Sequence, residues 1–350
     1  MAAGARRARI SIGLALTAGC AAAVLTAGTA GHAATGHAAT ERAATTTAMR
    51  QNAAARPVDS ATGTVTTSAP ATPPVNVLTA PTLIAHTAAG DVGYRVVGQG
   101  PPLLLIMGRG GSMDNWAPSF VDALAARHQV VLFDNAGVGQ TAAVGAPLTI
   151  PAMADQTSAL ITALRLRRPA VLGWSLGGMV AQALAAAHPG QVGRLILAAT
   201  QPGTGRALPI PPAAQAALNS TNPETVLSVL FPRDQAAAAQ AYLQGILEYP
   251  GFYEAPAAVS QSQDAAIAQW MAGQVPVGHQ LGRLRVPTLV ADGTRDRLDP
   301  AFNDVLLARG IRGARLLLFP DAGHAFLFQD AAQFTAAVEW FLRSRTGPRM

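Results

Sequence analysis

The chain has 350 residues, of which 50% are hydrophobic and 13% are charged, enough to bury the core of one large α/β domain or two small ones. Its formal net charge is +6, but residues 1–80 hold six of the arginines against only Glu41 and Asp59. The remainder is nearly balanced and carries no basic stripe, so the composition argues against general disorder and against a nucleic-acid partner.

The N-terminal residues 1–33 have the pattern of an export signal. Arg6, Arg7 and Arg9 supply a positive segment, and an apolar run begins at Ile10. No later stretch approaches the roughly 20 uninterrupted apolar residues that a transmembrane helix needs. We therefore expect an exported protein that is secreted or associated with the cell envelope, without a membrane span once the signal is removed.

The single cysteine leaves two outcomes open for this segment. Cys20 ends the string LALTAGC, which resembles a bacterial lipobox, although Thr17 stands where leucine is usual. Cys20 becomes a lipid-anchored N-terminus if the lipobox is used, whereas cleavage near Ala33 removes it. In both cases the folded part has no cysteine and therefore no disulfide.

Residues 34–81 consist mostly of Ala, Thr, Gly, Ser and Pro, with almost no large apolar side chains. Such a segment cannot bury enough surface to offset the entropy that it would lose on ordering. It is therefore predicted to be a disordered tether, and ordered structure is expected to begin near Leu83.

An alternation of strand-like and helix-like segments follows. The strand-like runs are apolar almost throughout, which favours an α/β fold with a mostly parallel sheet covered by helices on both faces. The predicted strands are Gly93–Val97, Leu103–Met107, Gln129–Phe133, Ala170–Leu172, Leu195–Ala198, Thr288–Ala291 and Arg315–Phe319. The predicted helices are Met113–Ala126, Ile150–Leu164, Met179–Ala187, Ala301–Ala308 and Ala331–Leu342.

One interval breaks the alternation. Residues 203–282 contain no convincing strand, only Pro-rich turns and helix-like pieces at Gln235–Leu247 and Ala257–Met271. Because sheet strands are expected on both sides of this interval, an insertion is a simpler account than a separate domain. The predicted organisation is an α/β core of residues 82–202 and 283–350, with residues 203–282 inserted as a helical cap.

The string GWSLG at residues 173–177 stands between a predicted strand and a predicted helix. Gly-x-Ser-x-Gly in this context is the pattern of a nucleophile elbow, in which small residues let the two backbones approach and raise the serine on a strained turn. Ser175 is therefore the candidate nucleophile. The backbone N–H of Leu176, at the positive end of the following helix, is a candidate donor to an oxyanion.

A serine nucleophile needs a histidine base that an acid orients, and on this scaffold the chain order is Ser, then Asp or Glu, then His. The segment after the strand at Thr288–Ala291 offers Asp292, Asp296 and Asp299, and the loop after the last strand offers His324. All three roles can be filled in the required order, and the choice among the aspartates is open on this ground alone.

These motifs resemble those of the α/β-hydrolase superfamily, over essentially all of residues 83–345. Acid loops of that family commonly read P-x-L-x-x-x-G-x-x-D-x-x-x-P, which this chain matches at Pro287, Leu289, Gly293, Asp296 and Pro300. The resemblance selects Asp296 as the acid and His324, in a Gly-His pair, as the base. Asp299, directly before a proline, then fits the structural role of a helix N-cap or turn residue better than Asp296 does.

The resemblance also supplies a second oxyanion donor. The string MGRGG at residues 107–111 looks like the family's H-G-x loop, with Met107 where histidine is usual, which implies the backbone N–H of Arg109. With Trp116, the match extends to a subset of bacterial family members in which this loop has the sequence M-G-x-G-G-S-x-x-x-W. Trp116 and Trp174, which is next to the nucleophile, are candidates for an apolar substrate pocket.

Neither a cofactor nor a metal ion is predicted. The glycines of Gly137-Val-Gly139 lack the third glycine of a dinucleotide-binding loop and open no phosphate-binding helix. No pair of histidines has metal-ligand spacing, and the string HExxH is absent. The expected partner is a small acyl substrate.

The predicted function is that of a serine hydrolase that uses Ser175, His324 and Asp296. It cleaves carboxylic ester or lactone bonds of small to medium substrates through an acyl-enzyme. A serine nucleophile argues against the family's dehalogenases and epoxide hydrolases, which have aspartate there. Open alternatives on the same triad are a cofactor-free haloperoxidase or perhydrolase, an aminopeptidase with Glu248 or Glu254 as its anchor, and a carbon–carbon bond hydrolase. An alternative of another class is a small-molecule binding protein that keeps the fold without turnover.

Overall fold

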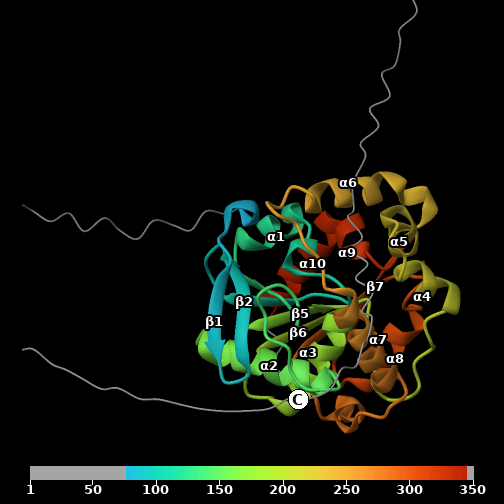
Figure 1. Ribbon diagram of the computed structural model, residues 1–350. Helices are drawn as coiled ribbons and strands as arrows, with labels where there is room; N and C mark the ends of the chain where they lie inside the picture. Colours follow the sequence, from blue (N-terminus) through green and yellow to red (C-terminus); the bar gives the residue numbers. More distant parts are fainter. Residues whose placement is uncertain (1–75, 345–350) are drawn as a thin grey trace, which may run out of the picture. The chain divides into compact units, whose positions relative to one another are not determined.

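The computed structural model describes residues 76–344, which form an eight-stranded sheet with helices on both faces (Figure 1). The strand order is β1-β2-β4-β3-β5-β6-β7-β8; the pairs β1/β2 and β2/β4 are antiparallel and every other pair is parallel. The strands are β1 (Leu83–Thr87), β2 (Gly90–Val97), β3 (Pro102–Ile106), β4 (Gln129–Phe133), β5 (Ala170–Trp174), β6 (Arg194–Ala198), β7 (Thr288–Gly293) and β8 (Arg315–Phe319). The predicted mostly parallel α/β sheet is confirmed.

The central strands bury both of their faces, as their continuous apolar sequence predicted. In β3, Leu103 and Leu105 belong to one hydrophobic cluster, whereas Leu104 and Ile106 belong to the other. All four side chains are buried, because successive residues of a strand point to opposite faces and helices cover each face.

The helices of the core flank this sheet. Helices α1 and α10 pack together on one face, and α2 and α3 pack together on the other (Figure 1). Their bounds are α1 (Pro118–Ala125), α2 (Ile150–Ala163), α3 (Leu176–Ala187), α8 (Phe302–Gly310), α9 (Phe326–Gln329) and α10 (Ala331–Arg343), with short 3-10 helices η1 (Val77–Thr79) and η2 (Met113–Asn115). No helix of residues 76–344 is long and apolar enough to cross a membrane.

Two sequence predictions need correction at their boundaries. The tether was expected to extend to residue 81, but Val77 is buried, and its N–H donates a 2.8 Å hydrogen bond to Asp122 of α1. The helix expected at Met113–Ala126 is instead η2 followed by α1, which begins at Pro118 because proline favours the first turn of a helix. The predicted signal segment, Cys20 and residues 34–75 of the tether lie outside the described residues.

The interval between β6 and β7 is helical. It contains α4 (Pro212–Leu218), α5 (Pro223–Leu230), α6 (Ala236–Ile246) and α7 (Ala257–Met271), with 3-10 helices η3 (Arg233–Gln235) and η4 (Pro276–Arg283). This segment is called the cap below. Helices α4 and α5 were not predicted, because short Ala- and Pro-containing helices lack a clear apolar period.

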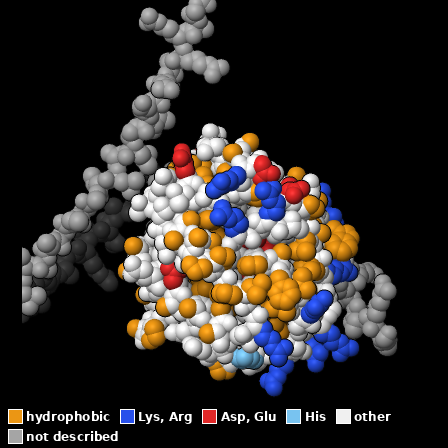
Figure 2. All heavy atoms as spheres, turned by 90° about the vertical axis from the view of Figure 1, so that its right-hand side faces the viewer, with side chains coloured by type: hydrophobic (Ala, Val, Ile, Leu, Met, Phe, Trp, Pro, Cys, Tyr) orange, Lys and Arg blue, Asp and Glu red, His pale blue; other side chains and the backbone are white. Residues whose placement is uncertain are grey.

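The first part of the cap is joined to α8 of the core. Asn303 accepts the N–H of Leu208 at 2.7 Å and donates to its carbonyl at 3.1 Å. The side of the molecule that carries α4, α5 and α8 shows hydrophobic side chains bordered by arginines and acidic residues (Figure 2). Leu208 and Phe302 are among the exposed large hydrophobic residues of the structure.

Candidate active site

Ser175 stands at the junction of β5 and α3 in a strained backbone conformation. Its φ of 55° and ψ of −120° lie outside the regions that residues with a side chain normally adopt. A Cβ on Gly173 would lie 2.2 Å from the carbonyl oxygen of Gly177, and a Cβ on Gly177 would lie 2.0 Å from that of Ile106. Thr200 donates a 2.7 Å hydrogen bond to the Ser175 carbonyl and so helps to hold the turn. The glycines of the motif are therefore required by close backbone contact.

His324 and Asp296 follow β8 and β7 along the chain, and the structure brings them together. His324 Nδ1 and Asp296 Oδ2 are 2.6 Å apart, and both side chains are buried. The other oxygen of Asp296 accepts the backbone N–H groups of Leu298 and Asp299 at 2.7 and 2.8 Å. These bonds fix the carboxylate, so Nε2 is the ring nitrogen of His324 that is left for proton transfer.

The pKa of His324 reflects two opposing causes. Burial lowers the pKa, but the charge of Asp296, its hydrogen bond and the charge of Asp299 outweigh burial, so the pKa lies above its ordinary value. The buried Asp296 carboxylate thus stabilises the protonated imidazole that forms when a histidine accepts a proton.

Ser175 and His324 line the same cavity, which lies between the core and cap helices α4 and α7. Its volume is about 20 Å³, roughly the space of one water molecule. The apolar lining residues are Met179, Ala199, Ile210, Leu218, Ile267 and Leu298. The polar ones, besides Ser175 and His324, are Arg109, Gln201, Gln215, Asp264 and Asp299.

The loop after β3 lies directly against the elbow. A Cβ on Gly108 would lie 3.3 Å from Ser175 Cβ, so the backbone that leads into Arg109 passes beside the serine. Leu176 is the first residue of α3, where backbone N–H groups have no partner within the helix. The carbonyl of Met107 accepts a 2.8 Å hydrogen bond from Asn135 Nδ2. This hydrogen bond from Asn135 helps to hold the loop in place.

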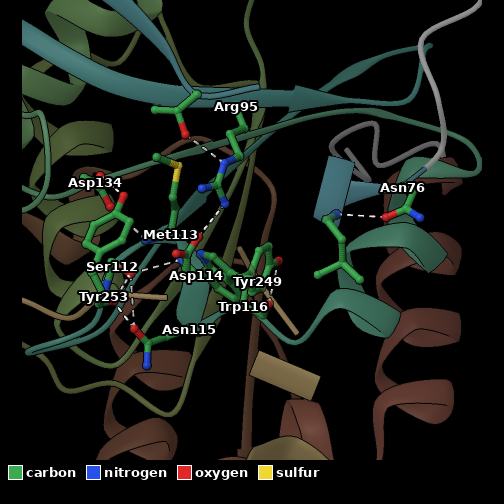
Figure 3. A network of polar contacts seen from close by, with 12 residues as sticks. Asn76, Arg95, Ser112, Met113, Asp114, Asn115, Trp116, Asp134, Tyr249 and Tyr253 are labelled. Atoms are coloured by element: carbon green, nitrogen blue, oxygen red, sulfur yellow. Dashed lines mark hydrogen bonds and ion pairs between the residues drawn. The ribbon is translucent and has the colours of Figure 1, made fainter. Parts of the chain in front are cut away.

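A network of polar contacts ties this loop to the cap (Figure 3). Asp134 accepts the N–H of Met113 at 2.8 Å and the hydroxyl of Tyr253, a cap residue, at 2.5 Å. Ser112 donates a 2.6 Å hydrogen bond to the carbonyl of Tyr253. Burial raises the pKa of Asp134 to about 6, although the bonds from Tyr253 and Met113 oppose the increase. Asp134 is thus a structural acid at the boundary of cap and core.

The segment after the loop is anchored by a buried ion pair. Arg95 of β2 donates to Asp114 of η2, and both side chains are buried (Figure 3). Burial raises the pKa of Asp114, although the charge and hydrogen bond of Arg95 lower it. Ser112 caps η2 by accepting the N–H of Asp114, and its own N–H donates to the side chain of Asn115. None of these side chains lines the cavity, which indicates a supporting role.

Three further aspartates are buried beside Asp296. Asp292, Asp299 and Asp304 each place a carboxylate oxygen within 4.8 Å of the others, the one such group of potential metal ligands among the described residues. Oxygen ligands at this spacing suit a hard cation. However, burial and then the charge of Asp296 raise the pKa of Asp299 to about 7, and burial raises the pKa of Asp292 and Asp304 well above the ordinary value. Burial therefore makes these three carboxyl groups hold their protons more strongly than exposed aspartates do.

Trp116 and Trp174 make their main contacts outside this cavity, and Asp299 does not cap a helix. Trp116 and Trp174, expected in the substrate pocket, do not line the cavity; their rings lie 6.3 Å apart, and both pack on Phe328. Trp174 instead donates a 3.0 Å hydrogen bond to the His324 carbonyl, which positions the base. Asp299 does not cap α8, whose N-cap is Ala301, but accepts a hydrogen bond from Asn303.

Sequence reasoning missed the polar residues that face Ser175 from the cap. The side chain of Arg109 was not assigned a role, yet it lines the cavity and pairs with Asp264 of α7. These two residues are 155 positions apart, and neither belongs to a motif that predicts the pairing.

Comparison with known proteins agrees with this fold. A family model described as alpha/beta hydrolase fold matches residues 101–331. The chain therefore belongs to the alpha/beta hydrolase family.

Its relatives include several kinds of hydrolase. The chain is 31% identical over 255 residues to the Azorhizobium caulinodans protein named "Putative carbamate hydrolase RutD", covering 69% of this chain and 91% of the relative. An alpha/beta hydrolase fold protein from Chitinophaga pinensis superposes with a TM-score of 0.69 at 27% identity, over 76% of this chain and 98% of that one. A thermophilic esterase from Thermogutta terrifontis, solved with malate bound, superposes with a TM-score of 0.59 at 26% identity, over 75% of this chain and 98% of that one.

Proposed function

We propose that the protein is a serine hydrolase that cleaves carboxylic ester or lactone bonds of small to medium substrates. The observation that carries this proposal is the 2.6 Å contact between His324 and Asp296, with His324 in the lining of the cavity that also contains the strained Ser175. The esterase from Thermogutta terrifontis, which shares the fold at 26% identity, supports the ester class.

The proposed reaction has two halves. Ser175 Oγ attacks the substrate carbonyl while His324 Nε2 accepts its proton, and the buried Asp296 holds the imidazole and stabilises its positive charge. The oxyanion accepts the backbone N–H groups of Arg109 and Leu176. His324 then returns the proton to the leaving alcohol, and water hydrolyses the acyl-enzyme by the same steps.

A second candidate is the hydrolysis of carbamates, favoured by the 31% identity to the Azorhizobium caulinodans relative. A carbamate presents the same kind of carbonyl to the same three residues. The aminopeptidase alternative has less support, because neither Glu248 nor Glu254 lines the cavity.

We also propose that the protein acts outside the cytoplasm. Support comes only from the sequence of residues 1–33, with their arginines and apolar run. Cell fractionation, with mass spectrometry of the mature N-terminus, tests this point and distinguishes cleavage near Ala33 from a lipid on Cys20.

The experiment for the activity is hydrolysis of p-nitrophenyl esters from acetate to palmitate, with a p-nitrophenyl N-alkylcarbamate alongside. We expect Ser175→Ala to abolish turnover and Asp296→Asn to lower kcat strongly, while Asp321→Asn, an exposed aspartate in the next loop, has little effect. Folding of each variant is checked by circular dichroism. Turnover that survives in Ser175→Ala contradicts the proposal, and a folded wild type without turnover favours the binding-protein alternative.

A further inference from the structure

The side chain of Arg109 joins the core to the cap above the candidate nucleophile. Its Nε donates to Asp264 Oδ1 at 2.9 Å and its Nη2 to Asp264 Oδ2 at 2.7 Å, a two-point contact that matches the planar guanidinium to a carboxylate. The same Nη2 donates to Asn219 Oδ1 at 2.5 Å. Arg109 is 12% exposed and Asp264 is 28% exposed in their side chains, so the pair is largely shielded from water.

The partners of Arg109 come from the cap. Asp264 lies in α7, and Asn219 follows α4 directly. Arg109 itself lies in the core loop after β3, whose backbone passes beside Ser175. One residue further on, Gly110 donates its N–H to Gln263 of α7 at 2.8 Å. The contacts of Arg109 and Gly110 therefore close α7 onto this loop.

The cavity is narrow in this conformation. Its volume of about 20 Å³ leaves room for little more than a water molecule, so an acyl group needs the cap side chains of the lining, Asp264 among them, to give way. A displacement of α4 and α7 would carry Asp264 and Asn219 away, because both belong to the cap, whereas Arg109 lies in the core loop after β3. The guanidinium would then be left without its carboxylate partner beside the nucleophile.

With Asp264 displaced, the charge of the remaining cavity lining would favour an anion at this place. Arg109 is the one lysine or arginine side chain in the lining, within the part of the chain that the structure describes. The second acid of the lining, Asp299, is held by Asn303 Nδ2 at 2.7 Å, and burial raises its pKa to about 7, so it carries only part of a negative charge at neutral pH. An unpaired, poorly solvated guanidinium next to apolar side chains needs a new acceptor.

We propose that the Arg109 side chain is the recognition site for a carboxylate carried by the substrate, which takes the place of Asp264. The substrates are then esters or lactones whose acyl part bears a free carboxylate, such as monoesters of dicarboxylic acids. This inference rests on the proposed function. It adds a specificity role for the Arg109 side chain to the oxyanion role of its backbone N–H.

The test compares two methyl esters that differ only in the charge at the far end. Hydrolysis of monomethyl glutarate and dimethyl glutarate by the full-length protein is followed in a pH-stat, and the ratio of their kcat/KM values is the readout. We expect the wild type to prefer the monoester by about tenfold to a hundredfold, the range of a hydrogen bond to a charged group. Arg109→Gln, which keeps the backbone N–H, removes the preference.

Two further variants sharpen the comparison. Asp264→Asn removes the competing carboxylate, so the KM for the monoester falls and the preference increases. Arg312→Gln, an exposed arginine outside the cavity lining, makes the same change in net charge and leaves the ratio as in the wild type. A wild type that prefers the diester, or an unchanged ratio in Arg109→Gln, overturns the inference. A preference for an ester that carries an ammonium group would do so too, because Asp264 would then be the recognition residue.

Binding is measured separately from turnover. Calorimetric titration of the Ser175→Ala protein with monomethyl glutarate and dimethyl glutarate should show tighter binding of the monoester, and this difference should vanish when Arg109→Gln is added. Equal binding of the two esters overturns the inference even if both are hydrolysed. Selective binding without turnover in the wild type supports the carboxylate site and contradicts the proposed hydrolase, so the two failures are distinguishable.

Discussion

The buried aspartates beside the candidate triad predict how the stability of the protein depends on pH. Asp299 has an ordinary pKa of 3.8, and burial followed by the charge of Asp296 raises it to about 7 in the folded protein. Each unit corresponds to about 1.36 kcal/mol, so ionising this carboxyl in the folded state costs about 4 kcal/mol. Folding is favoured while the group keeps its proton.

The sign of the effect follows from proton binding. Between pH 4 and pH 7 the unfolded chain has lost the proton of Asp299 while the folded protein still holds it, so the free energy of unfolding decreases as the pH rises. Burial raises the pKa of Asp292 and Asp304 as well, and these groups act in the same direction. We therefore expect these groups to contribute more to the free energy of unfolding near pH 4.5 than near pH 8.

The assay is urea unfolding at half-unit steps between pH 4.5 and 8 for the wild type and Asp299→Asn. An asparagine can still accept the hydrogen bond from Asn303, so the variant is expected to fold. The free energy of unfolding should decrease less across this pH range in Asp299→Asn than in the wild type, and the two decreases should differ by up to about 4 kcal/mol. Asp321→Asn, on the exposed loop before His324, serves as the control. Identical pH profiles for the wild type and Asp299→Asn would refute the assignment of a proton to Asp299.

Three other predictions concern the elbow, the cap and the N-terminal segment. Gly177→Ala places a Cβ 2.0 Å from a strand carbonyl oxygen, so it should lower the free energy of unfolding in urea by about 1–3 kcal/mol or more. Gly190→Ala is the control, because a Cβ at that position meets no atom within 4 Å and should change stability little. Tyr253→Phe removes a hydrogen bond that stabilises the ionised form of Asp134 and lowers its pKa. The decrease in the free energy of unfolding should therefore be larger above pH 6 than below it. Equal decreases at both pH values would contradict this prediction. Deleting residues 1–75 should leave a soluble, active protein, and an insoluble or inactive product would count against the tether prediction.

The parts of the fold that sequence predicted are those set by local patterns. Continuous apolar runs identified the parallel strands, and Gln129–Phe133 and Arg315–Phe319 have the observed bounds because each run ends at a sharp change in polarity. Ser175 and His324 were predicted because an elbow and a Gly-His loop occupy fixed places on this scaffold, and the cavity lining contains both. The choice of Asp296 needed the family pattern, since three aspartates within eight positions are equivalent by composition alone.

The parts that sequence did not predict depend on contacts between distant segments. Val77 is buried in a hydrophobic cluster of the core, and its N–H is bonded to Asp122, 45 positions away; nothing in the Ala- and Pro-rich segment indicates these contacts. Trp174 was expected in the pocket because it adjoins the nucleophile, but consecutive residues at the end of a strand point in opposite directions, and its ring lies among Trp116, His324 and Phe328.

The residues of the candidate triad and the residues that face them come from different parts of the fold. The motifs for the candidate nucleophile, acid and base lie in the core, within the residues 101–331 that the family model matches. The side chains that face Ser175 across the cavity, such as Gln215, Asp264 and Ile267, come from α4 and α7, where no motif was found. We therefore expect substrate selection in this chain to depend on the cap residues that face Ser175 and Arg109. Exchanging α7 between this chain and a relative should change substrate preference while leaving the Ser175 reaction in place.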